Sequence, residues 1–196
     1  RNLADDLRLA AAAGAGHVIA PDPASMYPDG YRYRVTEGEV AAVLEGVHRP
    51  GHFDGVLTIV IKLLNLVRPH RAYFGEKDYQ QYLLVRGMVE ALLLPVDIVP
   101  CPTVRDADGL ALSSRNVRLS AAARSRAALL PAILAEAPSS EEARQRLLEA
   151  GFEIDYVAEA WGRRLAAVVI EGVRLIDNLP LAADGAALMT RRMGCC

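Results

Sequence analysis

The chain of 196 residues is 52% hydrophobic and 23% charged, and its formal net charge is -2. These proportions are typical of a globular protein and exclude a disordered or fibrous one, and so small a net charge gives no bulk attraction to nucleic acid. The longest apolar helical stretch, residues 56–67, is interrupted by Lys62 and is too short for a membrane span, which needs about 20 apolar residues. We therefore expect a protein that binds neither nucleic acid nor a membrane.

Cysteine usage and the first residues favour a cytoplasmic location. Cys101, Cys195 and Cys196 have no metal-ligand spacing and form a poor disulfide framework. The residues after Arg1 contain no hydrophobic segment with a cleavage site, so no secretory signal is expected. We expect no metal site built from the protein's own side chains.

The first third of the chain predicts short helices and strands. Asn2 can cap a helix that ends near Gly14 or Gly16, and tyrosine and valine alternate with arginine before residue 36, as in a half-exposed strand. In chain order we predict a helix at 3–11, strands at 17–20 and 31–35, a short helix at 39–45 and a longer helix at 53–67.

Residues 68–119 have the pattern of a phosphate-handling α/β unit. A buried strand at 72–74 leads through Gly75 into a helix from about 76 to 94, and a second strand follows at 96–99. Glycine at the end of a strand lets a ligand come close to the backbone, and a helix N-terminus offers free N–H groups to an anion. The unit therefore predicts a nucleotide site.

Lys77 is the first candidate for a phosphate contact. A cation in the first turn of a helix meets the positive end of the helix dipole, so either Glu76 and Asp78 compensate it at a solvated helix start, or a bound phosphate does so. Gln80 and Gln81 follow and cannot both face the core, so either could bind a substrate hydroxyl or carboxylate. No Walker pattern occurs in the chain.

Two polar loops could also contact an anionic ligand. The loop that ends in Ser113, Ser114 and Arg115 carries two hydroxyls and a planar cation suited to phosphate oxygens, and a polar turn before a helix is the alternative. Arg49 and His52 lie in an earlier loop, whose alternative interpretation is ordinary solvated polarity.

The second half of the chain places helices before antiparallel strands. Ser120 and Ser139 are good helix N-caps, and Glu171-Gly172 favours a hairpin. We predict helices at 121–135 and 140–150, then strands at 152–158, 165–170 and 173–176, and a loose tail from about 182. The whole chain thus predicts a doubly wound α/β domain followed by a small α+β domain.

Long motifs resemble the family of pantothenate synthetases, also called pantoate-beta-alanine ligases. They are MYPDG at 26–30, GHFDGVLTIVIKLLNLVRP at 51–69, FGEKDYQQ at 74–81, PTVRDADGLALSSRN at 102–116 and RLIDN at 174–178. The resemblance implies an α/β fold with an incomplete Rossmann-like nucleotidyltransferase domain at 1–103 and a smaller α+β lid domain at 104–196. It also implies a homodimer.

The resemblance further implies an ATP-dependent ligase. In that reaction the pantoate carboxylate attacks the α-phosphorus of Mg²⁺-bound ATP and pyrophosphate leaves. The amine of β-alanine then attacks the pantoyl adenylate, which gives pantothenate (vitamin B5) and AMP. Such a reaction needs two anions to be aligned and the charge on the phosphate oxygens to be stabilised.

The resemblance assigns roles to matching positions of this sequence. The implied catalytic residues are Lys77, Ser113, Ser114 and Arg115, and the last three occupy the place of the family's Lys-Met-Ser-Lys-Ser-like loop. The implied ATP-binding residues are Gly75, Lys77, Asp78, Val104, Ser113, Ser114 and Arg115, and the implied pantoate-binding residues are Gln81, Arg49 and His52.

The sequence departs from the family pattern in two places. The family's N-terminal strand and its His-Ile-Gly-His-like motif are not found, and the segment between Tyr156 and Leu165 is short. We therefore expect a fragment or truncated homologue of the ligase. The alternatives are another nucleotidyltransferase that makes no amide, and a non-catalytic nucleotide-binding or dimerisation remnant.

Overall fold

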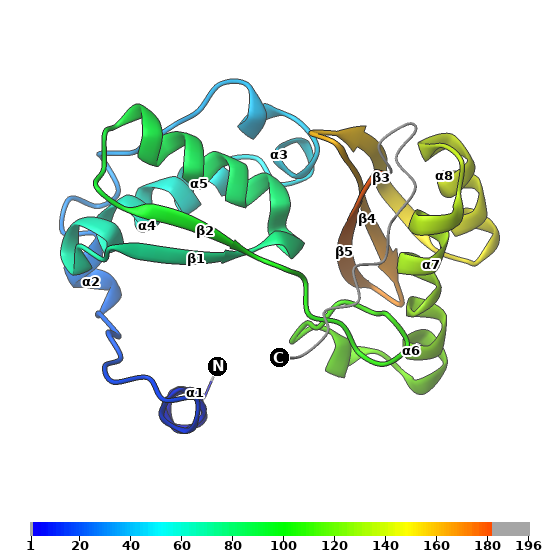
Figure 1. Ribbon diagram of the computed structural model, residues 1–196, viewed down its shortest axis with the longest axis horizontal. Coiled ribbons are helices and arrows are strands. Elements are labelled where there is room, and N and C mark those ends of the chain that lie inside the picture. The colour runs from blue at the N-terminus through cyan, green and yellow to red at the C-terminus, as the bar shows by residue number, and fades with distance from the viewer. Residues whose placement is uncertain (1, 182–196) are drawn as a thin grey trace, which may run out of the picture.

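The computed structural model describes residues 2–181, in two lobes that each contain a sheet. Figure 1 shows the parallel pair β1 and β2 in one lobe and the antiparallel strands β3, β4 and β5 in the other. The tail expected to be loose from residue 182 lies outside the described residues. The predicted α/β class, with a separate α+β unit after the parallel sheet, is confirmed.

The first lobe is built around two parallel strands joined by a helix. Strand β1 (Arg71–Gly75) pairs with β2 (Asp97–Cys101) in the register Arg71↔Asp97 to Gly75↔Cys101. Helices α4 (His52–Val67) and α5 (Tyr79–Ala91) pack on each other and on the sheet. Their contact is a core of Phe53, Leu57, Leu64, Leu84, Val85, Met88 and Val89. This core fixes the end of β1, where the predicted site begins.

The predicted helix at 76–94 has different ends in the structure. It starts as a 3-10 turn, η2 (Glu76–Asp78), before α5 begins at Tyr79. It stops at Ala91, because Leu93 has a positive φ of 54° that no helix tolerates. The second strand is likewise two residues longer at its end than predicted.

The predicted strands at 17–20 and 31–35 are wrong, since neither segment pairs with a strand. In the second segment the backbone N–H groups donate to side chains instead: Tyr33 to the Asp29 carboxylate at 2.8 Å and Val35 to the Thr58 hydroxyl at 3.0 Å. Backbone donors that are satisfied in this way have no need of a strand partner.

The predicted helix at 39–45 is also wrong. It is divided into a 3-10 turn, η1 (Val40–Ala42), and a short helix, α3 (Glu45–His48). Leu44 separates them with φ 47°, a conformation outside the right-handed helical region. The break turns Glu45 and Arg49 towards the second lobe.

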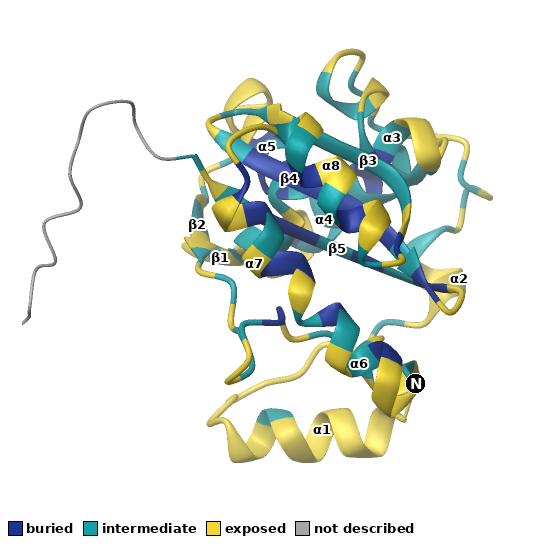
Figure 2. Cartoon of the chain, turned by 90° about the vertical axis from the view of Figure 1, so that its right-hand side faces the viewer, coloured by how far each residue is buried: buried dark blue, intermediate teal, exposed yellow. Residues whose placement is uncertain are grey.

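The N-terminal helices lie at the edge of the first lobe. Helix α1 (Leu3–Ala12) has its predicted cap, since the Asn2 side chain accepts the Asp5 N–H. None of its residues is buried, and Figure 2 shows it apart from the rest of the chain. Helix α2 (Pro23–Met26) is a single capped turn.

The second lobe packs helices on an antiparallel sheet. After η3 (Asn116–Arg118) come helices α6 (Ala121–Ala127), α7 (Leu129–Glu136) and α8 (Ser140–Glu149). Strands β3 (Glu153–Ala160), β4 (Arg163–Ile170) and β5 (Val173–Pro180) follow in the order β3-β4-β5. The strands are longer than predicted.

Short sequence signals, namely helix caps, a hairpin turn and a proline, explain where most elements of this lobe begin and end. Ser120 and Ser139 cap their helices as predicted, and Glu171-Gly172 forms the predicted hairpin with positive φ at both residues. The predicted single helix at 121–135 is broken at Ala128, because Pro131 has no N–H and its ring collides with a carbonyl one turn earlier. No helix within residues 2–181 has the length and apolarity to cross a membrane.

Replacing Leu147 with alanine tests the core of the second lobe. The side chain is 0% exposed, so Leu147→Ala should lower the free energy of unfolding by about 2–5 kcal/mol. Urea unfolding followed by the fluorescence of Trp161, the single tryptophan, measures the change. The neighbouring Leu148 is 41% exposed, and Leu148→Ala should change stability by no more than about 0.5 kcal/mol. Equal losses in both variants would contradict this packing.

Candidate active site

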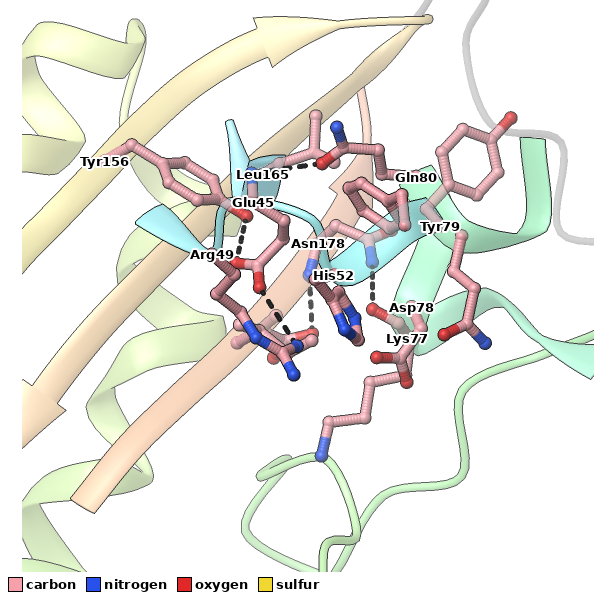
Figure 3. A pocket seen from close by; sticks show the side chains of 14 residues that line it. Glu45, Arg49, His52, Lys77, Asp78, Tyr79, Gln80, Tyr156, Leu165 and Asn178 are labelled. Atoms are coloured by element: carbon pink, nitrogen blue, oxygen red, sulfur yellow. Dashed lines mark hydrogen bonds and ion pairs between the residues drawn. The ribbon is translucent and has the colours of Figure 1, made fainter. Parts of the chain in front are cut away.

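A cavity lies where the two lobes meet (Figure 3). Helix α3, the turn η2 with the start of α5, and strands β3, β4 and β5 all contribute to its wall. It is narrow, about 20 Å³, so a nucleotide must lie partly outside it. Its lining comprises Glu45, Arg49, His52, Phe53, Lys77, Asp78, Tyr79, Gln80, Gln81, Tyr156, Leu165, Ile176, Asp177 and Asn178.

Lys77 sits on η2, at the end of β1, as the sequence predicts. Its Nζ donates to the Leu112 carbonyl at 2.9 Å, which ties the start of α5 to the polar loop. Burial lowers the pKa of Lys77, and the negative charges of Asp78 and Asp177 act against that shift. An added Cβ on Gly75 would meet no atom within 4 Å, so the backbone before Lys77 is open to a ligand.

The two adjacent glutamines have different roles. Gln80 is buried, and its amide nitrogen donates to the carbonyls of Val40 at 2.7 Å and Val43 at 2.8 Å. Its amide oxygen accepts the Glu45 N–H at 3.2 Å. Gln80 therefore holds the segment before α3, whereas Gln81 is only partly buried and lines the cavity.

The short helix α3 and the residues after it bring Glu45, Arg49 and His52 to the cavity. A Cβ on Gly46 would overlap the Ala41 carbonyl, so this close turn needs glycine. Burial is the main cause that lowers the pKa of His52, and the positive charge of Arg49 lowers it further. A neutral His52 imidazole can both donate and accept a hydrogen bond in the cavity.

Glu45 and Arg174 form an ion pair that links the two lobes. The Glu45 carboxylate, 7% exposed, accepts from both terminal nitrogens of Arg174, at 2.7 and 2.8 Å. Arg174 Nε also donates to Asp155 at 2.6 Å, and the Tyr156 hydroxyl donates to Glu45 at 2.9 Å. This planar, two-point pairing of arginine with carboxylate fixes geometry as well as charge.

The protonation of this group follows from its surroundings. Burial alone would raise the pKa of Glu45, but the hydrogen bonds and charge of Arg174 hold it below its usual value. Burial and the Glu45 charge together raise the pKa of Tyr156. Burial works against the charged form of Arg174, yet its bonds to Glu45 and Asp155 raise its pKa. The ion pair is therefore charged at neutral pH.

A second, wider cavity of about 460 Å³ lies beside the ion pair of Glu45 with Arg174, and Arg49 lines both cavities. Its lining comprises His48, Arg49, Arg115, Arg118, Asp155, Val169, Gly172 and Arg174. Arg115 donates to the Arg174 carbonyl at 3.2 Å, and its own N–H donates to the Ser113 hydroxyl at 3.1 Å. Several arginines and one carboxylate make this cavity suited to an anion.

The structure brings only part of the predicted set together. Lys77, Asp78, Gln81, Arg49 and His52 line the first cavity, and Arg115 lines the second. Gly75, Val104, Ser113 and Ser114 line neither. Val104 is 66% exposed, and its carbonyl accepts the Leu112 N–H at 2.9 Å.

Sequence reasoning missed Glu45, Tyr156, Arg174, Asp177 and Asn178 as site residues. The motif at 174–178 supported the family resemblance, but no role was assigned to its polar side chains. A signal was present, since Asp177 and Asn178 are polar residues in a strand that, apart from Arg174, is otherwise apolar. Such residues are rarely buried without a partner, and Asp177 pairs with Arg105 at 2.7 and 2.8 Å.

The chain is similar to known proteins over most of its length. Residues 1–180 match the family model for pantoate-beta-alanine ligase. The pantothenate synthetase of Bdellovibrio bacteriovorus is 47% identical over 176 residues, which are 90% of this chain and 70% of that protein. The pantothenate synthetase of Legionella pneumophila is 49% identical over 178 residues, which are 91% of this chain and 71% of that protein.

Solved structures show the same arrangement. A crystal structure of pantothenate synthetase from Thermus thermophilus has a TM-score of 0.82 and 44% identity, and the match covers 92% of this chain and 75% of that one. Pantoate-beta-alanine ligase from Francisella tularensis, crystallised with beta-gamma ATP and beta-alanine, has a TM-score of 0.85 and 36% identity over 92% of this chain and 70% of that one.

These likenesses define the class of protein. The parallel sheet followed by a separate antiparallel sheet is the architecture of a nucleotidyltransferase-like domain with a C-terminal domain. The chain belongs to the pantoate-beta-alanine ligase family.

The buried carboxylate makes stability depend on pH. Because the folded pKa of Glu45 lies below the ordinary glutamate value of 4.5, the stabilisation from its carboxylate is present above that pH and is lost as the pH falls through the folded pKa. Glu45→Gln should be less stable than the unchanged chain near neutral pH and should lose less stability between about pH 5 and pH 3. Urea unfolding across this range measures both.

Glu90 provides the matched control. Its side chain is 70% exposed and pairs with Arg86 on the surface of α5, so Glu90→Gln should follow the pH dependence of the unchanged chain. An unaltered acid profile in Glu45→Gln would show that the Glu45 carboxylate does not stabilise the junction.

Proposed function

We propose that this chain joins pantoate to β-alanine at the expense of ATP, through a pantoyl adenylate. The observation that supports this most is the placement of two cations, Lys77 and Arg115, on either side of the junction. Among residues 2–181 each donates to a backbone carbonyl rather than to a carboxylate. Their charge is therefore available to an incoming anion, as phosphate binding requires.

In the first step the pantoate carboxylate attacks the α-phosphorus of ATP, and the bond to pyrophosphate breaks. Both reactants are anions, so the attack needs cations that hold them in line. We assign the phosphates to Lys77 and Arg115, with Ser113 and Ser114 added when the loop approaches. Lys77 is already bonded to Leu112 of that loop, which supports a common movement.

The remaining contacts divide between the two substrates. Gly75 offers open backbone to the nucleoside side, together with Asp78 and the backbone near Val104. Gln81, Arg49 and His52 line the first cavity on the proposed pantoate side. In the second step the amine of β-alanine attacks the acyl carbon, AMP leaves, and the amide forms.

Mg²⁺ is proposed to arrive with ATP. Within residues 2–181 no group of three or more histidine, cysteine, aspartate or glutamate side chains could hold a metal ion. In nucleotide sites Mg²⁺ is commonly bound by the substrate phosphates together with one or two carboxylates. The family resemblance also supports a homodimer, a cytoplasmic location, and domains at 1–103 and 104–196 as parts of the same proposal.

A direct assay tests the function. The chain is incubated with ATP, Mg²⁺, pantoate and β-alanine, and mass spectrometry follows AMP and pantothenate. Both products should appear together and only when all the substrates are present. Pyrophosphate release without an amide would indicate another nucleotidyltransferase. The absence of turnover, with or without ATP binding, would indicate a non-catalytic nucleotide-binding or dimerisation module.

Removing the Lys77 cation should impair the reaction strongly. Lys77→Ala is expected to lower kcat/KM by about 100-fold or more, the usual effect of losing one group that stabilises transition-state charge. Arg86→Ala, on the following helix α5, removes an exposed cation that pairs with Glu90 and should leave kcat/KM within about 2-fold. Full activity in Lys77→Ala would contradict the proposed phosphate contact.

A further inference from the structure

We infer that Asn178 is a positioning residue that sets the backbone of Lys77 for ATP, an inference that rests on the proposed function. Asn178 lies on β5 in the second lobe and is 2% exposed. Its side-chain amide nitrogen donates to the carbonyls of Glu76 and Lys77, each at 2.9 Å. Both carbonyls belong to η2 of the first lobe, about a hundred residues earlier in the chain.

The orientation of the Asn178 amide is fixed by its third partner. Arg163 Nε donates to the Asn178 side-chain oxygen. A guanidinium group only donates, so the oxygen must face Arg163 and the nitrogen must face the two carbonyls. Both hydrogens of the amide nitrogen are then used, and the side chain has no other arrangement that satisfies all of its partners.

Asp177 holds the same point of β5 from the other side. Its carboxylate, with a side-chain exposure of 0%, accepts two bonds from Arg105 and the backbone N–H of Asn178 at 2.8 Å. The strand is therefore fixed where Asn178 reaches into the first lobe.

Two fixed carbonyls determine two N–H directions. A peptide unit is planar, and its N–H points opposite to its C=O. The bonds to the Glu76 and Lys77 carbonyls therefore orient the N–H groups of Lys77 and Asp78, which lie in the first turn before α5. The N–H groups of a turn at the start of a helix, together with the Lys77 side chain, are donors of the kind that an anion requires.

The same strand also carries the other proposed phosphate ligand. Arg174 lies four residues before Asn178 on β5, and its backbone carbonyl accepts a hydrogen bond from the Arg115 side chain. Lys77 and Arg115 are thus both tied to β5, one through a side-chain amide and one through a backbone carbonyl. Loss of the Asn178 amide should therefore release the backbone at Lys77 and leave Arg115 held by the Arg174 carbonyl.

The test measures ligand affinity rather than turnover. In Asn178→Asp a carboxylate replaces the donor amide with nearly unchanged shape, and Asn178→Ala removes the group. By calorimetry the Kd for ATP should rise about 10- to 100-fold in both variants, the effect of losing buried hydrogen bonds. The Kd for pantoate should stay within about 3-fold. Equal changes in both affinities, or no change, would overturn the inference.

Arg164→Ala is the control for a merely structural role. Arg164 is 5% exposed and donates to the carbonyls of Leu134 and Ala137 within the second lobe. Its loss should therefore lower the stability of the chain without specifically weakening the affinity for ATP. If Arg164→Ala weakens ATP binding as much as Asn178→Ala does, the selective role of Asn178 is refuted.

Carbonyl chemical shifts separate this inference from the proposed function. If the unchanged chain binds no ATP, the proposed function fails, but the backbone claim is still tested. The Glu76 and Lys77 carbonyls lose their hydrogen bonds in Asn178→Ala, so their carbonyl carbon resonances should move in that variant and stay in place in Arg164→Ala. Unmoved carbonyl resonances in Asn178→Ala would overturn the positioning role in either case.

Discussion

The paired hydrogen bonds between Glu45 and Arg174 are the interaction on which the junction depends. They join residues 129 positions apart and place a nearly buried carboxylate against a guanidinium group. Burying such a charge is costly unless it is paired and hydrogen-bonded. Arg174 meets that need, with Tyr156 as a third donor. The pairing sets α3 against the second lobe, and the residues that follow α3 line both cavities.

Strand β5 extends this connection to the reactive groups. Its Arg174 side chain holds α3, its Arg174 carbonyl holds Arg115, and its Asn178 side chain holds the backbone at Lys77. Strand β5 is hydrogen-bonded to β4 along its whole length and contributes Val173 and Leu175 to the core of the second lobe. It is therefore a rigid support, which a site of this kind requires. The two proposed phosphate ligands come from segments far apart in sequence, yet one strand positions both.

The sequence predicts elements with local signals and misses those that depend on distant contacts. The Ser120 and Ser139 caps, the hairpin at 171–172 and the strand-to-helix turn at Gly75 all follow from neighbouring residues. The strand at 31–35 fails because its donors bind Asp29 and Thr58. Lys77, Arg49 and His52 reach the first cavity as the motifs suggest. Glu45 could not be recognised because its partner Arg174 lies 129 residues away. The polar character of Asn178 gives a signal, but it does not identify the partners about a hundred residues away.

A double-mutant cycle between Glu45 and Arg174 tests the central claim most directly. The free energies of unfolding of Glu45→Gln, Arg174→Gln, the double variant and the unchanged chain yield the coupling between the two side chains. If the pair holds the junction, the coupling should be about 2 kcal/mol or more, as for close and desolvated charge pairs. If the stability lost in the double variant equals the sum of the losses in the two single variants within about 0.5 kcal/mol, the two side chains act independently. That result would contradict the account.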